Sequence, residues 1–232
     1  MSLLNVDEIE VFYSEFQALF GVSMAVEKGQ TVAIIGANGA GKTTLMRSIA
    51  GQLIPKNGDI LYKGDSTGKK TAYEMNRLGV AMVPEGRKIF PSLTVEENLQ
   101  LGAYAKRRGE WTLQKVYELF PILKERQNNS GVDLSGGQQQ MLAIGRALMS
   151  NPDLILMDEI SLGLAPIIVK QIYEVVSDIA ESGMTIVLVE QDVNRGLKAA
   201  DHVYCLLEGK VSLSGQPEKF SQEDISKAYF GI

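Results

Sequence analysis

The stretch QTVAIIGANGAGKTTL, residues 30–45, constrains the fold more than any other part of this chain. A short run rich in β-branched residues leads into it, and helical spacing follows it, so its glycine-rich loop is expected between a strand and a helix. The loop fits the pattern G-x-x-x-x-G-K-[ST], in which backbone amides surround phosphate groups. The sequence therefore predicts a site for a nucleoside triphosphate.

The residue types in this loop suit that ligand. Gly36, Gly39 and Gly41 let the backbone wrap around phosphates, Lys42 can reach the β- and γ-phosphates, and Thr43 can ligate Mg²⁺. An ordinary glycine-rich turn before a helix is the alternative. The motif leaves GTPases and small-molecule kinases open, but the chain has no N-K-x-D sequence for guanine, which favours ATP. The residues of this loop predicted to contact ATP are Gly36, Asn38, Gly39, Ala40, Gly41, Lys42, Thr43 and Thr44.

Apolar runs of strand length alternate with helical patterns over much of the chain, as in DLILMDE, IIVKQIYEVVSDIAESG and MTIVLVE. Such alternation predicts parallel strands joined by right-handed crossover helices, which is an α/β fold. Residues 1–35 predict further strands, and the spacing of Leu45, Ile49 and Leu53 predicts a helix after the glycine-rich loop. From about residue 91 to residue 150 the spacing is helical throughout, so we expect a helical insert there.

Composition excludes several classes of function. Lys and Arg number 23 and Asp and Glu 28, a net charge of −5 without a basic tail, so nucleic acid is not an expected partner. One cysteine, Cys205, and one histidine, His202, rule out a zinc site built from His and Cys, and we expect Cys205 to be a buried strand thiol. No stretch approaches the roughly 20 apolar residues of a membrane helix, and the first residues lack the pattern of a signal peptide. The chain is predicted to be cytosolic.

A pair of acidic residues ends the apolar run LILMDE. Asp158 and Glu159 would lie at the carboxyl edge of a parallel sheet, where α/β proteins bind their ligands. Asp158 is predicted to belong to the Mg²⁺ shell, and Glu159 to act as the general base that polarises the attacking water. Solvated acidic residues at a strand end are the alternative, but the phosphate loop favours the functional interpretation.

A second anion-binding loop, LSGGQ at residues 134–138, lies between the phosphate loop and that strand. This order resembles the ATP-binding-cassette (ABC) ATPases, over essentially the whole chain. The resemblance implies a RecA-like P-loop NTPase core of mostly parallel strands with N-terminal antiparallel strands, an inserted helical subdomain, and a head-to-tail pair of subunits. Each ATP would then lie between the P-loop of one subunit and the signature of the other, contacted by Ser135, Gly136, Gly137 and Gln138. Ser135 is also expected to cap its helix.

The resemblance divides the single ABC ATPase domain, residues 1–232, into a nucleotide-binding core of residues 1–90 and 151–232 and a helical signature subdomain of about 91–150. It matches Tyr13 to the aromatic residue that stacks on adenine. It also matches the loop SLGLAP, residues 161–166, to the segment that links the two sites of the dimer.

Three positions depart from the general pattern of the family. Glu85 in VPEGR stands where a glutamine usually senses Mg²⁺ and water, so it is assigned to ATP and to the metal, although a carboxylate repels phosphate unless a cation lies between them. Gln191 stands in place of a switch histidine, and its amide can still donate to the γ-phosphate. Ile160 replaces a proline after Glu159 and is expected to loosen that turn. His202 is expected to be a strand-end residue rather than a substitute for the switch.

The motifs VPEGR and LVEQ together resemble the smaller ATPase subunit of bacterial importers for branched-chain, hydrophobic amino acids. That implies ATP and Mg²⁺ as cofactors, a second ABC ATPase subunit, two transmembrane permease subunits, an external substrate-binding protein acting indirectly, and a peripheral position on the cytoplasmic face of the bacterial inner membrane. The alternatives are an importer ATPase for another small substrate, such as urea or short amides, a soluble ABC ATPase without a transport role, and an ATP-bound regulatory module with little turnover. In the helical segment, Trp111 is expected to pack at a helix entry, and Arg107 and Arg108 to be solvated.

Overall fold

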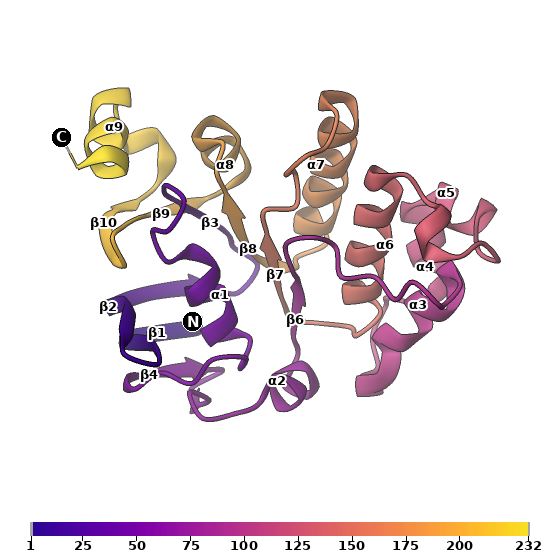
Figure 1. Ribbon diagram of the computed structural model, residues 1–232, viewed down its shortest axis with the longest axis horizontal. Coiled ribbons are helices and arrows are strands. Elements are labelled where there is room, and N and C mark those ends of the chain that lie inside the picture. Colours follow the sequence, from indigo (N-terminus) through magenta and orange to yellow (C-terminus); the bar gives the residue numbers. More distant parts are fainter. Residues whose placement is uncertain (1, 232) are drawn as a thin grey trace.

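The computed structural model describes residues 2–231, and its centre is a six-stranded sheet in the order β10-β9-β3-β8-β7-β6 (Figure 1). The inner strands are parallel, and only the edge strand β10 runs antiparallel to its neighbour. The strands are β3 (Thr31–Ile35), β6 (Val80–Val83), β7 (Leu154–Asp158), β8 (Thr185–Glu190), β9 (His202–Leu207) and β10 (Lys210–Gly215). The predicted α/β core is therefore confirmed.

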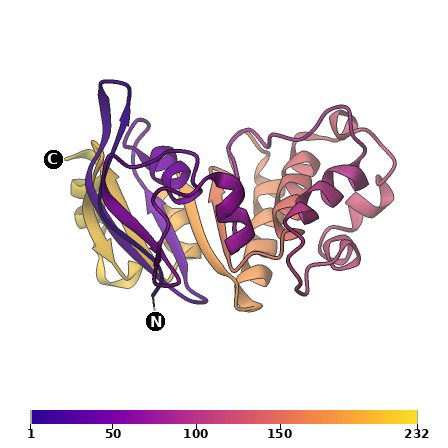
Figure 2. The ribbon, with the colours of Figure 1, turned by 90° about the horizontal axis from the view of Figure 1, so that it is seen from below.

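A second, antiparallel sheet forms most of the amino-terminal part, in the order β2-β1-β4-β5. Its strands are β1 (Ser2–Tyr13), β2 (Phe16–Glu27), β4 (Asn57–Tyr62) and β5 (Asp65–Ser66). This sheet packs on one face of the six-stranded sheet, with α1 (Lys42–Ile49) held between them (Figure 2). Leu45, Met46 and Ile49 of that helix are fully buried in the shared core.

Side-chain alternation along β3 explains how both faces of the six-stranded sheet are covered. Val32 and Ile34 join the core with α1, while Ala33 and Ile35 point to the opposite face, which α8 (Val193–Ala199) and α9 (Gln222–Phe230) cover. Farther along the same face, α7 (Pro166–Glu181) packs on β7 and β8. Every residue of β3, β7 and β8 is buried, as expected for a sheet covered on both sides.

Helices between β6 and β7 form one end of the molecule (Figure 1). They are α3 (Val95–Gly102), α4 (Leu113–Leu119), α5 (Pro121–Glu125) and α6 (Gly136–Leu148). Buried apolar side chains of these helices form one core that continues to β7 and α7. Thr94 and Ser135 begin α3 and α6 with capping boxes, so the expected cap at Ser135 is confirmed. None of the helices formed by residues 2–231 combines the length and apolar character that crossing a bilayer requires.

Several local predictions need correction. The helix after the phosphate loop ends at Ile49 rather than at Leu53, because the chain turns at Gly51 (φ 71°), where a Cβ would lie 2.6 Å from the carbonyl oxygen of Lys70. A helix not predicted from the sequence, α2 (Ala72–Leu78), precedes β6. Arg107 is not simply solvated, since it pairs with Asp153 at 2.6 Å. Trp111 is buried beside the cap of α4, and Cys205 is buried in β9, as predicted.

Candidate functional site: a nucleotide cleft at the carboxyl edge of the sheet

The glycine-rich loop joins β3 to α1 in the predicted strand–loop–helix order. Gly36 has φ 151° and Gly41 has φ 102°, conformations that favour glycine. Both glycines also lie in close contacts: a Cβ on Gly36 would be 2.3 Å from the carbonyl oxygen of Leu206, and one on Gly41 would be 2.7 Å from a methyl group of Leu19. The loop is therefore held by β9 at Gly36 and by β2 at Gly41.

Lys42 points back into its own loop. Its Nζ donates to the carbonyl oxygens of Gly36, at 2.8 Å, and Ala37, at 3.1 Å, and lies 3.6 Å from Oε1 of Glu159. The residue is 5% exposed, so its positive charge is held in place within the loop. Such a charge at a glycine-rich loop suits a phosphate group.

Thr43 contacts Asp158, the residue that the sequence analysis pairs with it as a predicted metal ligand. The Thr43 hydroxyl donates to Oδ1 of Asp158 at 3.4 Å, while Oδ2 of Asp158 is buried without a hydrogen-bond partner. Burial raises the pKa of Asp158 to about 6, and Glu159 and Glu85 add to the rise while the Thr43 hydrogen bond opposes it. A buried carboxylate oxygen without a donor fits a cation.

Mg²⁺ is usually held by one or two carboxylates together with substrate phosphates and water. Among residues 2–231 no three His, Cys, Asp or Glu side chains form a group that could hold a metal ion. The Thr43 hydroxyl and the buried Asp158 carboxylate fit the usual magnesium pattern, in which phosphates of a nucleotide and water would supply the other ligands. Glu85 lines the same cleft as Thr43 and is available as a third oxygen ligand.

Replacing Asp158 by asparagine is expected to stabilise the nucleotide-free chain at pH 7.5. Since the folded-state pKa of about 6 lies above the ordinary value of 3.8, the folded chain binds more protons, and the free energy of unfolding falls as the pH rises through that window. The variant lacks this decrease, so its free energy of unfolding should exceed that of the wild type by up to roughly 3 kcal/mol at pH 7.5. The difference should shrink toward pH 4. Urea unfolding at both pH values measures it. An equal gain at both would contradict the raised pKa.

Glu159 and Gln191 face each other across the ends of β7 and β8. The Gln191 amide donates to Oε2 of Glu159 at 3.0 Å and to Oδ1 of Asn38 at 2.7 Å. Glu159 has φ 48°, a left-handed conformation that is unusual for a non-glycine residue and is often found at functional sites. Together, Lys42, Glu159 and Gln191 place a cation, a carboxylate and an amide around one point.

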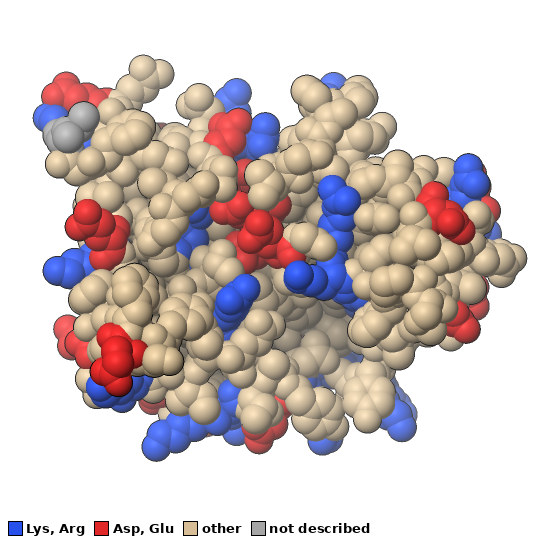
Figure 3. Space-filling model, in the orientation of Figure 1, with Lys and Arg blue, Asp and Glu red and all other residues tan. Residues whose placement is uncertain are grey.

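Aromatic side chains form the outer wall of this cleft, whose volume is about 780 Å³. Tyr13 is 40% exposed, and its hydroxyl lies 3.3 Å from that of Thr44. Phe16 and Phe20 also line the wall, and no motif in the sequence marks them. A flat aromatic ring at the mouth can stack on a nucleobase. In the space-filling view of Figure 3, acidic and basic side chains gather near the middle of the face that is drawn.

The signature loop lies outside the cleft. Among the described residues that line the cleft, none belongs to 134–138. Ser135 and Gln138 form the capping box of α6, and both glycines are closely packed: a Cβ on Gly136 would be 3.0 Å from the guanidinium of Arg87, and one on Gly137 would be 2.4 Å from Ile168. In this first turn the Gln138 N–H donates to the Ser135 hydroxyl, and the N–H groups of Gly136 and Gly137, which precede the first acceptor of the helix, can bind an anion.

The residues that depart from the family pattern are also placed. Ile160 is 1% exposed and packs in the core with α6 and α7, so it fills space in place of the expected proline. His202 is the first residue of β9, and its ring bonds to the Ser214 hydroxyl at 3.0 Å, as predicted for a strand-end residue. Sequence reasoning missed Asn38 as the partner of Gln191, 153 positions away.

Comparison with known proteins agrees with this geometry. Residues 19–161 match the family described as ABC transporter. The chain is 47% identical to the high-affinity branched-chain amino acid transport ATP-binding protein BraG of Pseudomonas aeruginosa, over 90% of this chain and 91% of that protein. It is 31% identical to a probable branched-chain amino acid transport ATP-binding protein, LivF, of Archaeoglobus fulgidus, over 99% of both.

Solved structures show the same fold. The ADP conformation of MJ1267, an ATP-binding cassette of an ABC transporter, aligns with a TM-score of 0.80 at 29% identity, covering 98% of this chain and 94% of that one. The dimeric post-hydrolysis state of the cassette MJ0796, bound to ADP and Pi, aligns with a TM-score of 0.83 at 25% identity, covering 94% and 100%. The predicted family and fold class are confirmed. The family match and these relatives together show that the chain belongs to the ABC transporter family, as one of its ATP-hydrolysing, nucleotide-binding cassettes.

Proposed function

We propose that this cassette hydrolyses ATP to drive the import of branched-chain, hydrophobic amino acids. The observation that carries the proposal is a split site: Lys42, Thr43 and Glu159 line one cleft, while the anion-binding end of α6 lies elsewhere on the chain. A second subunit supplies the missing half. The similarity to BraG and LivF supports the substrate class.

The residues of the cleft divide between binding ATP and hydrolysing it. Lys42 and the loop amides hold the β- and γ-phosphates, and Tyr13 stacks on adenine. Thr43, Asp158 and Glu85 would hold Mg²⁺, which supplies charge neutralisation at the β- and γ-phosphate oxygens when bound. Glu159 accepts a proton from the attacking water, and the Gln191 amide orients that water and the γ-phosphate. Gln191 has no ionisation near neutral pH.

The signature of the partner subunit closes the site. Ser135, Gly136, Gly137 and Gln138 would grip the γ-phosphate held by the other subunit, at the positive end of α6. Loss of that phosphate after hydrolysis opens the dimer. Residues 91–150 are proposed to move as a signature subdomain against a core of residues 1–90 and 151–232 during this cycle.

The cassette is proposed to work as part of a larger assembly. A second ATPase subunit, two transmembrane permease subunits and, indirectly, an external substrate-binding protein complete the importer. This assembly would place the chain peripherally on the cytoplasmic face of a bacterial inner membrane. The acidic net charge of −5 supports a partner other than nucleic acid.

Uptake by membrane vesicles tests the proposed substrate. Vesicles that hold the assembled transporter, with ATP inside the cassette-bearing compartment and the binding protein outside, are expected to accumulate radiolabelled leucine, and unlabelled isoleucine or valine should compete. Urea and acetamide serve as the matched alternatives. Inhibition of the uptake by urea and not by isoleucine would assign the cassette to a different importer. If the cassette purified from membranes carried nucleic acid and no membrane protein, a transport role would be excluded.

A further inference from the structure

A buried carboxylate at the end of β8 lies directly before Gln191 in the sequence. Glu190 is 2% exposed, although it carries an ionisable group. Burying a charge is costly unless hydrogen bonds and opposite charges compensate for it. The groups that surround Glu190 therefore determine how rigidly the carboxyl end of β8 is positioned.

Three side chains from three other segments surround this carboxylate. The Tyr173 hydroxyl donates to Oε1 of Glu190, and the Ser161 hydroxyl donates to Oε2 at 3.1 Å. The Arg195 guanidinium donates to the Ser161 hydroxyl at 2.9 Å and lies 3.8 Å from Oε2 of Glu190. We call these four residues, Ser161, Tyr173, Glu190 and Arg195, the Glu190 cluster.

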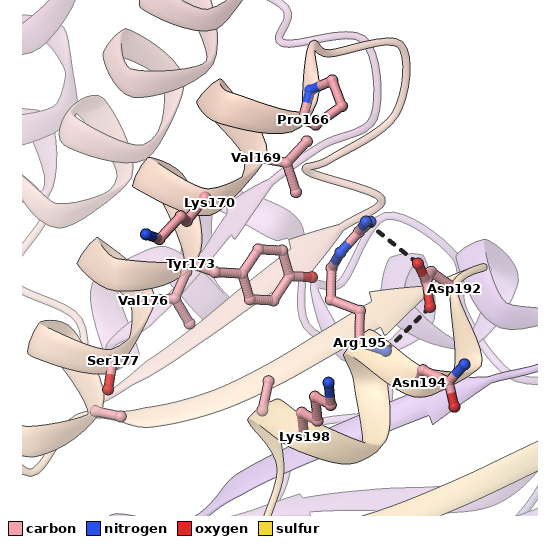
Figure 4. A pocket seen from close by; sticks show the side chains of 12 residues that line it. Pro166, Val169, Lys170, Tyr173, Val176, Ser177, Asp192, Asn194, Arg195 and Lys198 are labelled. Carbon is pink, nitrogen blue, oxygen red and sulfur yellow. Dashed lines mark hydrogen bonds and ion pairs between the residues drawn. The ribbon is translucent and has the colours of Figure 1, made fainter.

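The Glu190 cluster is anchored on both helices that flank it. Arg195 in α8 also pairs with Asp192 at 3.2 Å and lies 5.6 Å from the ring centre of Tyr173 in α7. Figure 4 shows the Tyr173 hydroxyl pointing toward Arg195 across the cleft between the two helices, whose volume is about 570 Å³. Burial raises the pKa of Glu190, while the hydrogen bonds from Tyr173 and Ser161 act in the opposite direction, so both donors favour the charged form.

The cluster sits next to Glu159 and Gln191, the two residues proposed to act on the attacking water. Ser161 follows Glu159 by two residues, and Glu190 is covalently joined to Gln191. The Gln191 amide is only 3.0 Å from the Glu159 carboxylate, so a small shift between the segments after β7 and β8 would change that contact. Ser161 bonded to Glu190 links those two segments directly.

We propose that the Glu190 cluster is a positioning device for hydrolysis: Tyr173 and Ser161, acting through Glu190, fix the spacing between Glu159 and Gln191. The inference rests on the proposed ATPase function of these two residues. None of the four cluster residues needs to touch the nucleotide. The cluster acts on the catalytic step, whereas the backbone of the phosphate loop is held separately, by β9 at Gly36 and by β2 at Gly41.

Tyr173→Phe in the transporter complex purified from membranes tests this device, because it removes one hydroxyl and keeps the ring. We expect kcat for ATP hydrolysis to fall roughly 10-fold, since even a 1 Å misplacement of reacting groups can cost about 100-fold. The KM for ATP should stay within about 2-fold of wild type, because the phosphate loop is untouched. Lys170→Gln is the matched control. Lys170 lines the cleft between α7 and α8 one turn before Tyr173 and lies outside the cluster, so kcat of this variant should equal that of the wild type.

Ser161→Ala and the double variant with Tyr173→Phe complete the test. Because both hydroxyls act through one carboxylate, the combined loss of kcat should be smaller than the product of the two single losses. Wild-type kcat in Tyr173→Phe would overturn the inference. So would a parallel loss of kcat, ATP affinity and melting temperature, which indicates packing alone. A wild-type complex that does not hydrolyse ATP would overturn the proposed function itself, whatever the variants do.

Discussion

Replacing Glu159 by glutamine is expected to lower ATP turnover by roughly 10²- to 10⁴-fold, the usual contribution of a general base. The amide has almost the same shape as the carboxylate but cannot accept the proton of the attacking water. Binding should survive, since the Lys42 ammonium keeps its two carbonyl partners in the loop. Phosphate release by the purified transporter complex measures the turnover, and ATP titration measures the binding.

The same variant should hold the dimer closed around ATP, which tests the split site. Chromatographic sizing of this chain together with its partner ATPase subunit should then show a stable dimer only when Mg²⁺ and ATP are both present. Glu181→Gln, at the exposed end of α7, is the charge-matched control and should keep full turnover. Unchanged hydrolysis in Glu159→Gln would remove Glu159 from the mechanism.

Replacing Lys42 by alanine is expected to weaken ATP binding by roughly 10²- to 10³-fold, because truncating one partner of a buried, hydrogen-bonded charge costs about 2–5 kcal/mol. The change removes the cation that faces the phosphates and leaves the carbonyl oxygens of Gly36 and Ala37 without their donor. Isothermal titration of the chain with ATP in Mg²⁺ measures the loss.

Lys124→Ala removes the same charge from the exposed surface of α5 and should leave the affinity unchanged. The two variants also separate the two steps of the reaction: Lys42→Ala fails at binding, whereas Glu159→Gln fails after it. Affinity of Lys42→Ala within about threefold of wild type would mean that the loop amides alone hold the phosphates.

The parts of the fold and of the candidate site that sequence predicts best are those with a continuous local signal. The buried strands β3 and β7 are short apolar runs, and the loop at 36–41 and the acid pair at Asp158 and Glu159 follow them directly. In each case the motif and its structural context lie within about fifteen residues. Local sequence therefore places the phosphate loop and the acidic strand end at one edge of the sheet.

Features with a weak local signal were missed or misjudged. Helix α2 buries only Met75, so it shows no apolar stripe. Ile49 ends α1 because the following turn packs against Lys70, a contact between segments that the spacing of leucines does not reveal. The ion-pair partner of Arg107 is not near it in the sequence, since Asp153 lies 46 positions away.

Contacts within the site were the least predictable. Sequence identifies Gln191 as a substitute for a histidine, but its bonds to Asn38 and Glu159 depend on the packing of three strand ends. No single motif marks the Glu190 cluster: Glu190 stands in LVEQ and Ser161 in SLGLAP, but the other two members come from two separate helices. Only the folded chain brings them together.

The tight packing of Gly36 and Gly41 has a kinetic consequence. With their backbone fixed against β9 and β2, the loop has its ligand-ready shape before any nucleotide arrives. Such preorganisation spares the entropy of ordering a flexible segment, and arrival needs no slow rearrangement. Nucleotide binding should thus occur in a single fast phase limited by diffusion. Any difference in affinity between ATP and ADP should then lie in their dissociation rates.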